Sequence, residues 1–340
     1  MSEQGARLKT GVIGLGVGRT HIQGYQAASA AEPVAVADVN EAALERAKAD
    51  YGIPTVYTDY RELLADDAIG AVSICTPDKF HAEQALAALD AGKHVLCEKP
   101  LALTAEEARA IVQKVRDTGL KFMMCHNYRF IPQFAELKQR LDSKILGQVY
   151  YGDSSYVQDL YSMAAFGPDY WRFKDPQNFY LGGAVHNVDL LLWLLGEVVE
   201  VSAYSNHAWE AYPIDENYVS NFRFADGSIG RVLLLLGSHM KDEFFVDLNI
   251  YGAGGALKAT MQSPHLIVNV ADLPSDRQDI IRVELANSHH LAIAAFVNSV
   301  LEDRTPPITV EDGARTVAVC LAAIESAREG RPVQVDYGLM

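Results

Sequence analysis

Two short stretches of the chain carry residues whose types and spacing suit proton transfer. In the first, Glu98, Lys99 and Pro100 follow a short apolar run; in the second, His186 and Asp189 follow a glycine turn. Residues three apart on a helix share one face, so Asp189 could orient His186. An imidazole, with a reference pKa of about 6.5, suits the removal of a proton from an alcohol, and a lysine ammonium stabilises the alkoxide that develops.

Both stretches also have a purely structural interpretation. The acid and the amine could be a surface pair at the entrance of a loop, and the histidine could be a buried core residue satisfied by its i+3 carboxylate. If Lys99 and His186 do chemistry together, they fit hydride transfer at an alcohol carbon, because a base must accept the hydroxyl proton while a cation stabilises the oxygen. These residues therefore predict a nicotinamide nearby.

A glycine-rich turn between an apolar run and a helical stretch predicts where that nicotinamide dinucleotide binds. Gly14 and Gly16 take the first two places of G-x-G-x-x-G, whereas Arg19 stands where the third glycine belongs and Gly18 falls one residue early. Glycines there permit a tight turn and a close approach of the backbone to a pyrophosphate. We expect these four residues and Val17 to contact the cofactor.

An acid at the end of the second apolar run predicts which dinucleotide is bound. Asp38 lies 38 − 16 = 22 residues after Gly16 and could accept both ribose hydroxyls of the adenosine. Val39 and Asn40 follow, and no adjacent arginine is present for a 2′-phosphate, so NAD is favoured over NADP. Alternatively, Asp38 could be the N-cap of a helix that begins at residue 41.

The N-terminal part of the chain alternates short apolar runs with helical stretches. Thr104 followed by Glu107 is typical of a capping box, and Gly119 would end that helix. Apolar strands separated by helices predict a doubly wound parallel sheet, covered on both faces, in an α/β protein. The expected strands are residues 11–15, 34–37, 71–75, 94–97 and 121–124, and the expected helices are residues 41–51, 81–91 and 105–118.

After about residue 145 strand-like runs follow one another, separated by turns such as Asp226-Gly227. This pattern predicts a C-terminal α/β domain with a large, mostly antiparallel sheet, and we place the domains at residues 1–126 and 127–340. The expected strands are residues 148–157, 198–205, 218–224, 229–236, 244–251 and 280–285, and the expected helices are residues 289–301 and 311–327.

Composition excludes several classes of protein. The 340 residues suffice for two domains, and the formal net charge of −15 should repel nucleic acid and anionic membranes. No apolar stretch approaches the roughly 18 residues of a membrane span, and the polar N-terminus does not read as a signal peptide. The 4 cysteines form no CxxC pair, so we expect a reduced, cytoplasmic protein without a metal site.

The chain resembles the glucose–fructose oxidoreductase / inositol dehydrogenase / MocA (Gfo/Idh/MocA) family of NAD(P)-dependent oxidoreductases. The likeness lies in "AVSICTPDKFHAEQALAALDAGKHVLCEKPLA" at residues 71–102, in "LGGAVHNVDLLLWLLGE", and in "VEDGARTVAVCLAAIESAREGRPVQV" near the C-terminus. With the glycine turn it covers nearly the whole chain. The resemblance implies an N-terminal Rossmann domain followed by a C-terminal α/β domain whose large sheet forms homodimers or homotetramers. It also implies that the substrate is a sugar, an inositol or a derivative of one.

The resemblance also implies roles for individual residues. Lys99 matches the catalytic lysine and His186 the acid–base histidine, while many members carry an aspartate where this chain has Gly182. The further positions that match cofactor contacts are Gly14, Gly16, Asp38, Thr76, Pro77, His81, Glu98, Asn127, Arg129, Trp171 and Arg172. The polar or aromatic candidates for contact with substrate are Tyr156, Asp159, Tyr161, Tyr170, Arg172 and His239, together with Lys99 and His186.

Three functions therefore compete. The leading hypothesis is an NAD(H)-dependent dehydrogenase or reductase of a polyhydroxylated small molecule. A second is a lyase or hydrolase in which tightly held NAD oxidises a sugar transiently. A third is a non-catalytic dinucleotide sensor, against which the presence of both Lys99 and His186 argues, because a sensor needs no proton acceptor.

Overall fold

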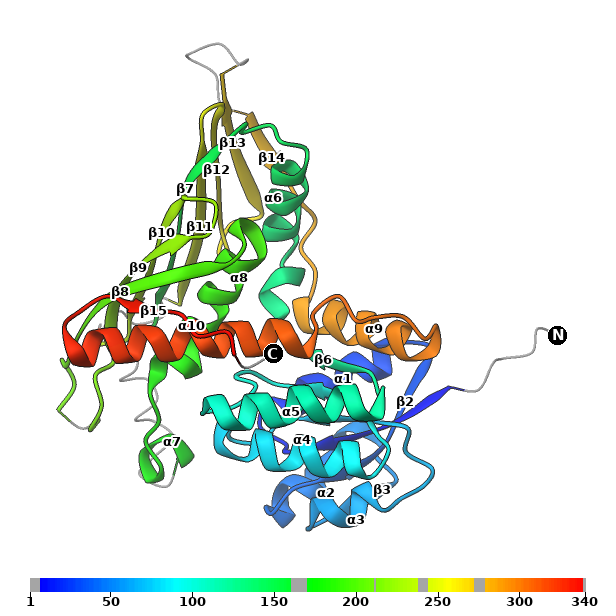
Figure 1. Ribbon diagram of the computed structural model, residues 1–340. Helices are drawn as coiled ribbons and strands as arrows, with labels where there is room; N and C mark the ends of the chain where they lie inside the picture. Colours follow the sequence, from blue (N-terminus) through cyan, green and yellow to red (C-terminus); the bar gives the residue numbers. More distant parts are fainter. Residues whose placement is uncertain (1–6, 160–169, 211, 238–243, 272–278, 339–340) are drawn as a thin grey trace. The chain divides into compact units, whose positions relative to one another are not determined.

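The computed structural model describes residues 7–159, 170–210, 212–237, 244–271 and 279–338. These residues form two compact units (Figure 1). The first contains the chain up to Asn127, residues 287–317 and the C-terminal end. The second contains residues 128–286 and 318–337. Residues 287–317 therefore belong to the compact unit of the N-terminal part, whereas the sequence places a single boundary between residues 126 and 127.

A six-stranded sheet in the order β3-β2-β1-β4-β5-β6 forms the centre of the first unit, and all its pairings are parallel. The order reverses between β1 and β4, and the carboxyl ends of strands at such a point are where ligands of open sheets bind. The strands are β1 Leu8–Ile13, β2 Ala31–Ala37, β3 Thr55–Tyr57, β4 Ala71–Ile74, β5 His94–Cys97 and β6 Phe122–Met124.

Helices cover the sheet of the first unit. Figure 1 shows α4 and α5 side by side, and α1 packs against α9. Thr104 and Glu107 form the predicted capping box of α5, and Gly119 ends it in the left-handed conformation at φ 66°. The helices are α1 Gly18–Ala27, α2 Glu41–Tyr51, α3 Tyr60–Leu64, α4 His81–Asp90, α5 Ala105–Thr118 and α9 Ser288–Leu301.

A nine-stranded sheet in the order β14-β13-β12-β11-β7-β10-β9-β8-β15 forms the second unit. Its pairings are antiparallel except that of β7 with β10, so the predicted fold class is confirmed. The strands are β7 Val149–Val157, β8 Val198–Asn206, β9 Asn217–Phe224, β10 Ile229–Leu235, β11 Phe245–Gly252, β12 Gly255–Thr260, β13 His265–Val270, β14 Asp279–Arg282 and β15 Val333–Gln334.

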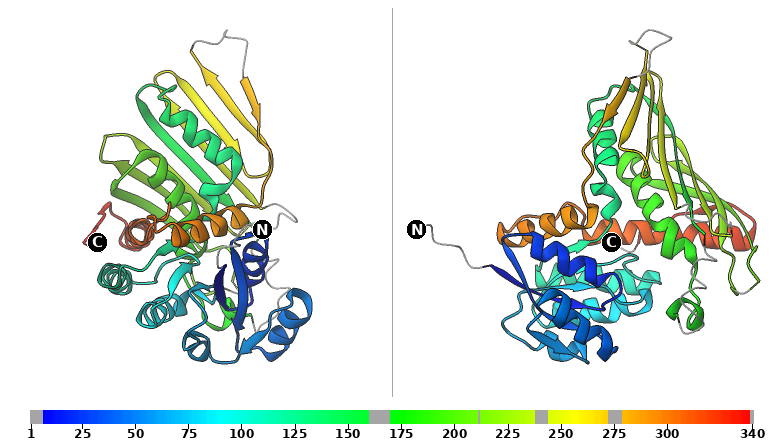
Figure 2. Two further views of the ribbon diagram at one scale, coloured as in Figure 1. Left: turned by 90° about the vertical axis from the view of Figure 1, so that its right-hand side faces the viewer. Right: turned by 180° about the vertical axis from the view of Figure 1, so that it is seen from behind.

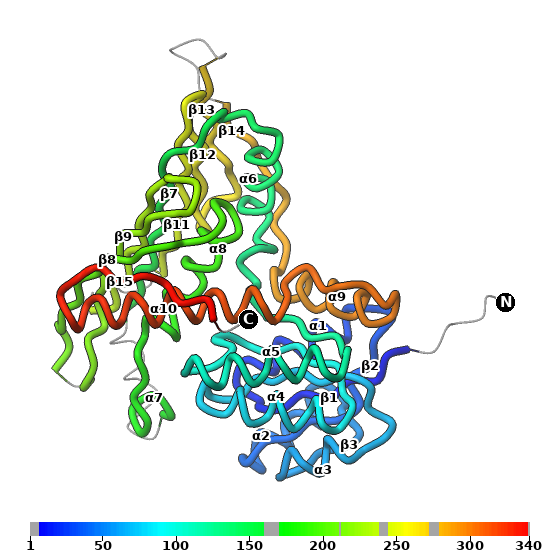
Figure 3. The backbone as a smooth tube through the Cα atoms, viewed as in Figure 1, coloured from blue at the N-terminus to red at the C-terminus, as the bar shows by residue number. Residues whose placement is uncertain are grey.

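Helices lie on one face of this larger sheet. Helix α6 (Pro132–Asp142) packs along β12 and β13, and α8 (Val185–Leu195) packs on β7 (Figures 2 and 3). Helix α10 (Val310–Glu329) begins in the first unit and ends in the second, where Ser326 accepts a hydrogen bond from the backbone of Ala203 on β8. Among the described residues, no helix combines the length and the apolar character needed to cross a membrane.

Candidate active site

The glycine turn lies between β1 and α1, at the carboxyl edge of the parallel sheet. Gly14 has φ +90°, and a Cβ atom there would lie 2.7 Å from the carbonyl oxygen of Cys75. A Cβ atom on Gly16 would meet no atom within 4 Å. The backbone conformation and close packing at Gly14 thus require a glycine for folding. At Gly16 the open space would instead allow the close approach of a pyrophosphate.

The start of α1 carries the remaining residues of the predicted turn. Val17 is the N-cap and makes no side-chain capping bond among the described residues, so the helix begins without a side chain covering its free N–H groups. Arg19, in place of the third glycine, is exposed and donates from Nε to the carbonyl of Gly16 at 3.3 Å. Gly18 is buried against Val12 and Cys75.

Asp38 ties the glycine turn to the end of β2. Its carboxylate accepts hydrogen bonds from the backbone N–H groups of Leu15, at 2.6 Å, and Asn40, at 2.8 Å. The N-cap of α2 is Asn40, whose side chain accepts from Ala43, so the alternative that Asp38 caps this helix is wrong. Val39 is 91% exposed.

The turns after β4 and β5 are joined by one buried histidine. His81 places Nε2 2.9 Å from the carbonyl oxygen of Thr76 and Nδ1 2.7 Å from that of Pro100. The Thr76 hydroxyl donates to Gln84 at 2.6 Å. Pro77 is the N-cap of the short 3-10 helix that leads to α4. Strand ends that carry predicted cofactor contacts are therefore fixed to each other.

Glu98 is the centre of a buried hydrogen-bond network. Its Oε1 lies 3.1 Å from Nε2 of His21 and 3.8 Å from Nε2 of His289, and its Oε2 accepts from the backbone N–H of Lys99 at 3.3 Å. Burial alone would raise the pKa of Glu98, but the hydrogen bond from His21 and the electrostatic interactions with His21, His289 and Lys99 lower that pKa well below its ordinary value. The carboxylate is therefore ionised beside the predicted catalytic lysine.

The network continues behind His21. Its Nδ1 lies 2.9 Å from the Ser73 hydroxyl, which lies 2.7 Å from the Tyr25 hydroxyl. Donor atoms of His21, Glu98 and Cys125 come within 4.8 Å of one another, the type of grouping that can hold a metal ion. Here hydrogen bonds link them, with 3.9 Å between the sulfur of Cys125 and Nε2 of His21.

Sequence reasoning missed the two histidines around Glu98. The signal for His21 was its place one helical turn after Gly18, on the face of α1 that is buried. His289 lies on α9 and is reached through Asn127, whose Nδ2 lies 3.0 Å from the Ser288 hydroxyl and 3.3 Å from Nδ1 of His289. That contact joins residues 162 positions apart, which no local pattern encodes.

In the second unit, His186 lies on α8 just after a π-helix (Tyr180–Ala184) that contains Gly182. The imidazole is 7% exposed and stacks on Tyr128, with 3.9 Å between ring centroids and an angle of 12°. Asp189, one turn later, accepts two hydrogen bonds from Arg129. Arg129 is therefore paired with Asp189, and the ring of Tyr128 covers one face of the His186 imidazole.

Two predicted substrate contacts, Tyr156 and Arg172, lie in the neighbourhood of the stacked Tyr128 and His186 rings. Burial raises the pKa of Tyr156 to about 12, against the opposing influence of Arg172, and Tyr156 in turn helps to raise the pKa of Tyr128. The Tyr156 hydroxyl donates to Gln158 at 3.0 Å. Arg172 lies over the ring of Trp171 at 4.1 Å. The structure thus groups these polar and aromatic residues with His186 in the second unit.

The other predicted contacts are dispersed. Asp159 forms an isolated backbone bridge with Gly237, and Tyr170 precedes the short helix α7 (Trp171–Lys174). Tyr161 and His239 lie outside the described residues.

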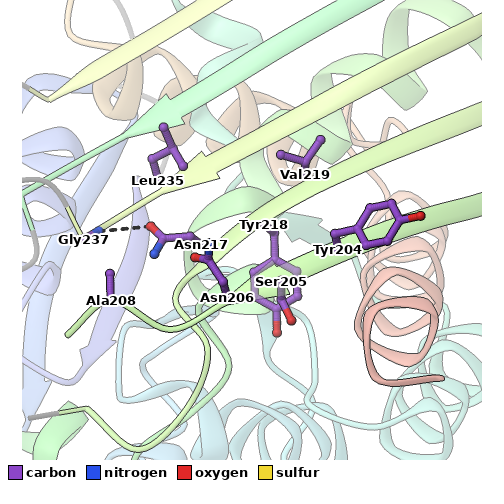
Figure 4. A pocket seen from close by; sticks show the side chains of 9 residues that line it. All are labelled: Tyr204, Ser205, Asn206, Ala208, Asn217, Tyr218, Val219, Leu235 and Gly237. Atoms are coloured by element: carbon purple, nitrogen blue, oxygen red, sulfur yellow. Dashed lines mark hydrogen bonds between the residues drawn. The ribbon is translucent and has the colours of Figure 1, made fainter. Parts of the chain in front are cut away.

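A cavity of about 420 Å³ lies elsewhere in the second unit, at the ends of β8, β9 and β10 (Figure 4). Its polar groups are engaged within the chain: Asn217 accepts from the backbone of Leu236 and Gly237, and Ser205 donates to Asp215. None of the predicted site residues lines it. Its lining consists of Tyr204, Ser205, Asn206, Ala208, Asn217, Tyr218, Val219, Leu235 and Gly237.

A parallel sheet with an open glycine position and an acid after its second strand defines a dinucleotide-binding protein of the Rossmann class. Comparison with known proteins gives the family. Residues 8–126 match the oxidoreductase family with an NAD-binding Rossmann fold, and residues 138–335 match its C-terminal α/β domain. The chain belongs to this family, Gfo/Idh/MocA, as its motifs predict, and it is an NAD-dependent oxidoreductase.

Relatives of defined activity cover most of the chain. Levoglucosan dehydrogenase of Pseudarthrobacter phenanthrenivorans is 30% identical over 74% of this chain and 73% of its own length. The scyllo-inositol 2-dehydrogenase (NAD(+)) of Bacillus subtilis is 27% identical over 97% of both chains. A solved levoglucosan dehydrogenase in complex with NADH superposes with a TM-score of 0.90 at 26% identity, covering 97% of this chain and 99% of its own.

Proposed function

We propose that this chain transfers hydride between NAD(H) and one CH–OH carbon of a sugar, an inositol or a derivative of one. The relatives named levoglucosan dehydrogenase and scyllo-inositol 2-dehydrogenase match it over most of their length, which supports a ring-shaped polyol as substrate. The observation that carries the proposal is the ionised Glu98 next to Lys99 at the carboxyl end of β5, the sheet edge at which the cofactor class binds.

In this proposal Lys99 and His186 divide the work of proton transfer. During oxidation of the alcohol, bound NAD would supply the hydride acceptor, and the imidazole of His186 accepts the hydroxyl proton. The ammonium of Lys99 donates to the same oxygen and stabilises its developing negative charge. Reduction runs the same steps in reverse. Gly182 supplies no carboxylate, so Asp189 contributes by fixing Arg129 rather than through a second acid beside the histidine.

The remaining predicted contacts have supporting roles in the same proposal. Gly14, Gly16, Val17, Gly18, Arg19, Asp38 and Val39 are proposed to hold the adenosine and pyrophosphate, and Thr76, Pro77, Glu98, Asn127, Arg129, Trp171 and Arg172 to contact the nicotinamide end. Tyr156 and Arg172 are proposed to contact the substrate, since Tyr156 lies near Tyr128, which stacks on His186, and Arg172 lies near Tyr156.

The decisive experiment is a screen of sugars, inositols and sugar acids for NAD reduction, followed by absorbance. Lys99→Ala and His186→Ala should each lower kcat by about 10²–10⁴, the usual contribution of acid–base groups, with NADH affinity kept. Lys114→Ala is the control, because Lys114 pairs with Asp90 on the surface. Turnover that survives both active-site substitutions would contradict the proposal. NADH binding without turnover of any compound would favour a sensor.

We also propose that the chain works as a homodimer or homotetramer in the cytoplasm. The face of the nine-stranded sheet opposite α6 and α8 carries Tyr204, 71% exposed, and Val219, 37% exposed, which a second copy would bury. A polar cluster of Arg231, Asp153 and Asn249 lies on β10, β7 and β11 of the same sheet. All four cysteines are free and buried, which fits a reducing compartment.

A further inference from the structure

His81 makes a pair of contacts that a neutral imidazole cannot satisfy. Both of its ring nitrogens lie within hydrogen-bond distance of backbone carbonyl oxygens, Nδ1 at 2.7 Å from Pro100 and Nε2 at 2.9 Å from Thr76. A carbonyl oxygen only accepts. A neutral imidazole has one N–H group and one lone pair, whereas the imidazolium ion has two N–H groups. With one proton missing, a nitrogen lone pair would face an oxygen lone pair at one of these short distances.

We propose that His81 is a doubly protonated clamp that holds the turn carrying Lys99 against the end of β4. The imidazolium donates one hydrogen bond to the carbonyl of Thr76, directly after β4, and one to the carbonyl of Pro100, directly after Lys99. Its catalytic consequence rests on the proposed role of Lys99. The clamp makes His81 a positioning residue rather than a contact of the cofactor, since both ring nitrogens are already used.

The position of His81 in the fold suits such a clamp. It is the first residue of α4 and is 1% exposed, so water does not compete for its two N–H groups. Strands β4 and β5 are neighbours in the sheet, with Ile74 opposite Cys97, so the two carbonyls belong to adjacent strand ends. Hydrogen bonds from a charged donor are stronger than neutral ones. One side chain therefore holds the turn after β4 and the turn after β5 together.

The charged residues of the elements that meet at His81 are Asp78 and Lys79 in the preceding 3-10 helix (Asp78–Phe80), Glu83 in α4, and Glu98 and Lys99 after β5. Glu83 is paired with Arg61 on the surface and Glu98 with His21, so the two carbonyl oxygens are the groups that stabilise the imidazolium. Burial of His81 and its place at the start of α4 both disfavour a positive charge there, and the two short hydrogen bonds must offset both effects.

The ring protons of His81 can be observed directly in the full-length chain. With ¹⁵N-labelled histidine at about pH 7.5, where histidines of unstructured peptides are mostly neutral, we expect two protonated ring nitrogens for His81. The variant His81→Gln identifies its signals among those of the ten histidines. His94 is the internal reference: its Nδ1 accepts from the backbone N–H of Lys121, so one of its nitrogens must be unprotonated. An unprotonated nitrogen on His81 would overturn the clamp.

A second measurement asks whether the clamp holds the turn, and it needs no substrate. A glutamine side chain donates from one nitrogen only, so His81→Gln cannot reach both carbonyls. Amide hydrogen exchange in peptides covering residues 97–103 should become at least about tenfold faster in His81→Gln. It should stay unchanged in His94→Gln, at the opposite end of β5. His81→Arg, which keeps a charge and several donors, should restore part of the protection. Unchanged exchange in His81→Gln would contradict the holding role.

The catalytic consequence is measured last. Displacement of a catalytic group by about 1 Å can cost about 100-fold in rate, so His81→Gln should lower kcat by about 10- to 100-fold. NADH affinity should change by less than about threefold, because His81 is not a cofactor contact in this proposal. A wild-type kcat in a folded His81→Gln enzyme would refute the positioning role. Absence of turnover in the wild-type chain would instead count against the proposed function, while the nitrogen signals and the exchange rates would still decide the clamp.

Discussion

Arg129 and Asp189 form a two-pronged ion pair inside the second unit. Nε of Arg129 donates to one carboxylate oxygen at 2.9 Å and Nη2 donates to the other at 2.7 Å. The side chain of Asp189 is fully buried and that of Arg129 is 9% exposed. Because Asp189 lies one turn after His186 on α8, the pair fixes the helix that presents the proposed base.

Removal of one partner should therefore be costly. Asp189→Ala leaves a buried guanidinium without its carboxylate, and we expect the free energy of unfolding to fall by about 3–5 kcal/mol. Denaturant unfolding measures this, with Glu83→Ala as the control. Glu83 pairs with Arg61 on the surface, where such pairs contribute about 0–1 kcal/mol. Equal losses of unfolding free energy in the two variants would show that the buried pair stabilises the fold no more than the exposed pair does.

The buried Glu98 predicts a pH dependence of stability. Its pKa in the folded state is lowered, so its contribution is complete above the unfolded value of about 4.5 and is lost as the pH falls towards the folded-state pKa. One such group contributes at most about 1.4 kcal/mol per pH unit. Unfolding measured from about pH 3 to pH 7 should show a shallower slope below pH 4.5 in Glu98→Gln. The slope of Glu106→Gln, exposed on α5, should match that of the wild type.

The local features of the fold could be predicted from the sequence, and the long-range contacts of the site could not. The capping box at Thr104 and Glu107 spans three residues, and the apolar runs of the parallel strands are continuous, so both are visible in the chain itself. Strands β12 and β13 were missed. Their alternation of buried with half-buried residues is carried by short, mixed segments that take their form from pairing with each other and with β11.

The site shows the same division. Gly14, Gly16 and Asp38 could be located by spacing because the Rossmann turn is local. The contact of His21 with Glu98 joins residues 77 positions apart, and that of Arg129 with Asp189 joins residues 60 apart. Such pairs depend on how strands and helices are placed in space, which one sequence does not reveal.

Asp38 predicts the choice of cofactor. Its carboxylate lies at the end of β2, held by Leu15 and Asn40, where it can accept the ribose hydroxyls and repel a 2′-phosphate. In Asp38→Asn, NADH affinity should fall at least about tenfold, because a hydrogen bond to a charged group contributes about 1.5–3 kcal/mol. NADPH should bind more tightly than it does to the wild type. Fluorescence titration measures both, and Glu45→Gln on the exposed face of α2 is the control. An unaltered preference for NADH over NADPH would show that another residue discriminates between the 2′-hydroxyl and the 2′-phosphate.

The face of the larger sheet predicts the effect of an added charge. Val219 points away from the buried side of β9, where Tyr218 and Ser220 lie. If a second copy covers this face, Val219→Glu should weaken association at least about 100-fold, because an unpaired buried charge costs several kcal/mol. Light scattering after gel filtration measures the mass, and Leu301→Glu, exposed in α9, is the control. An oligomer that persists in Val219→Glu would place the interface elsewhere.

The two glycines of the turn should separate folding from cofactor binding. In Gly14→Ala the new Cβ atom would lie 2.7 Å from a backbone oxygen, and φ is +90°, so we expect a loss of at least about 1–3 kcal/mol of unfolding free energy. In Gly16→Ala the Cβ atom would enter open space, so the melting temperature should stay near that of the wild type. The methyl group would nevertheless occupy the approach of the pyrophosphate, and NADH affinity should fall at least about tenfold. Thermal unfolding and NADH titration of both variants test this pair. Full NADH affinity in Gly16→Ala would mean that the dinucleotide does not pass over this turn.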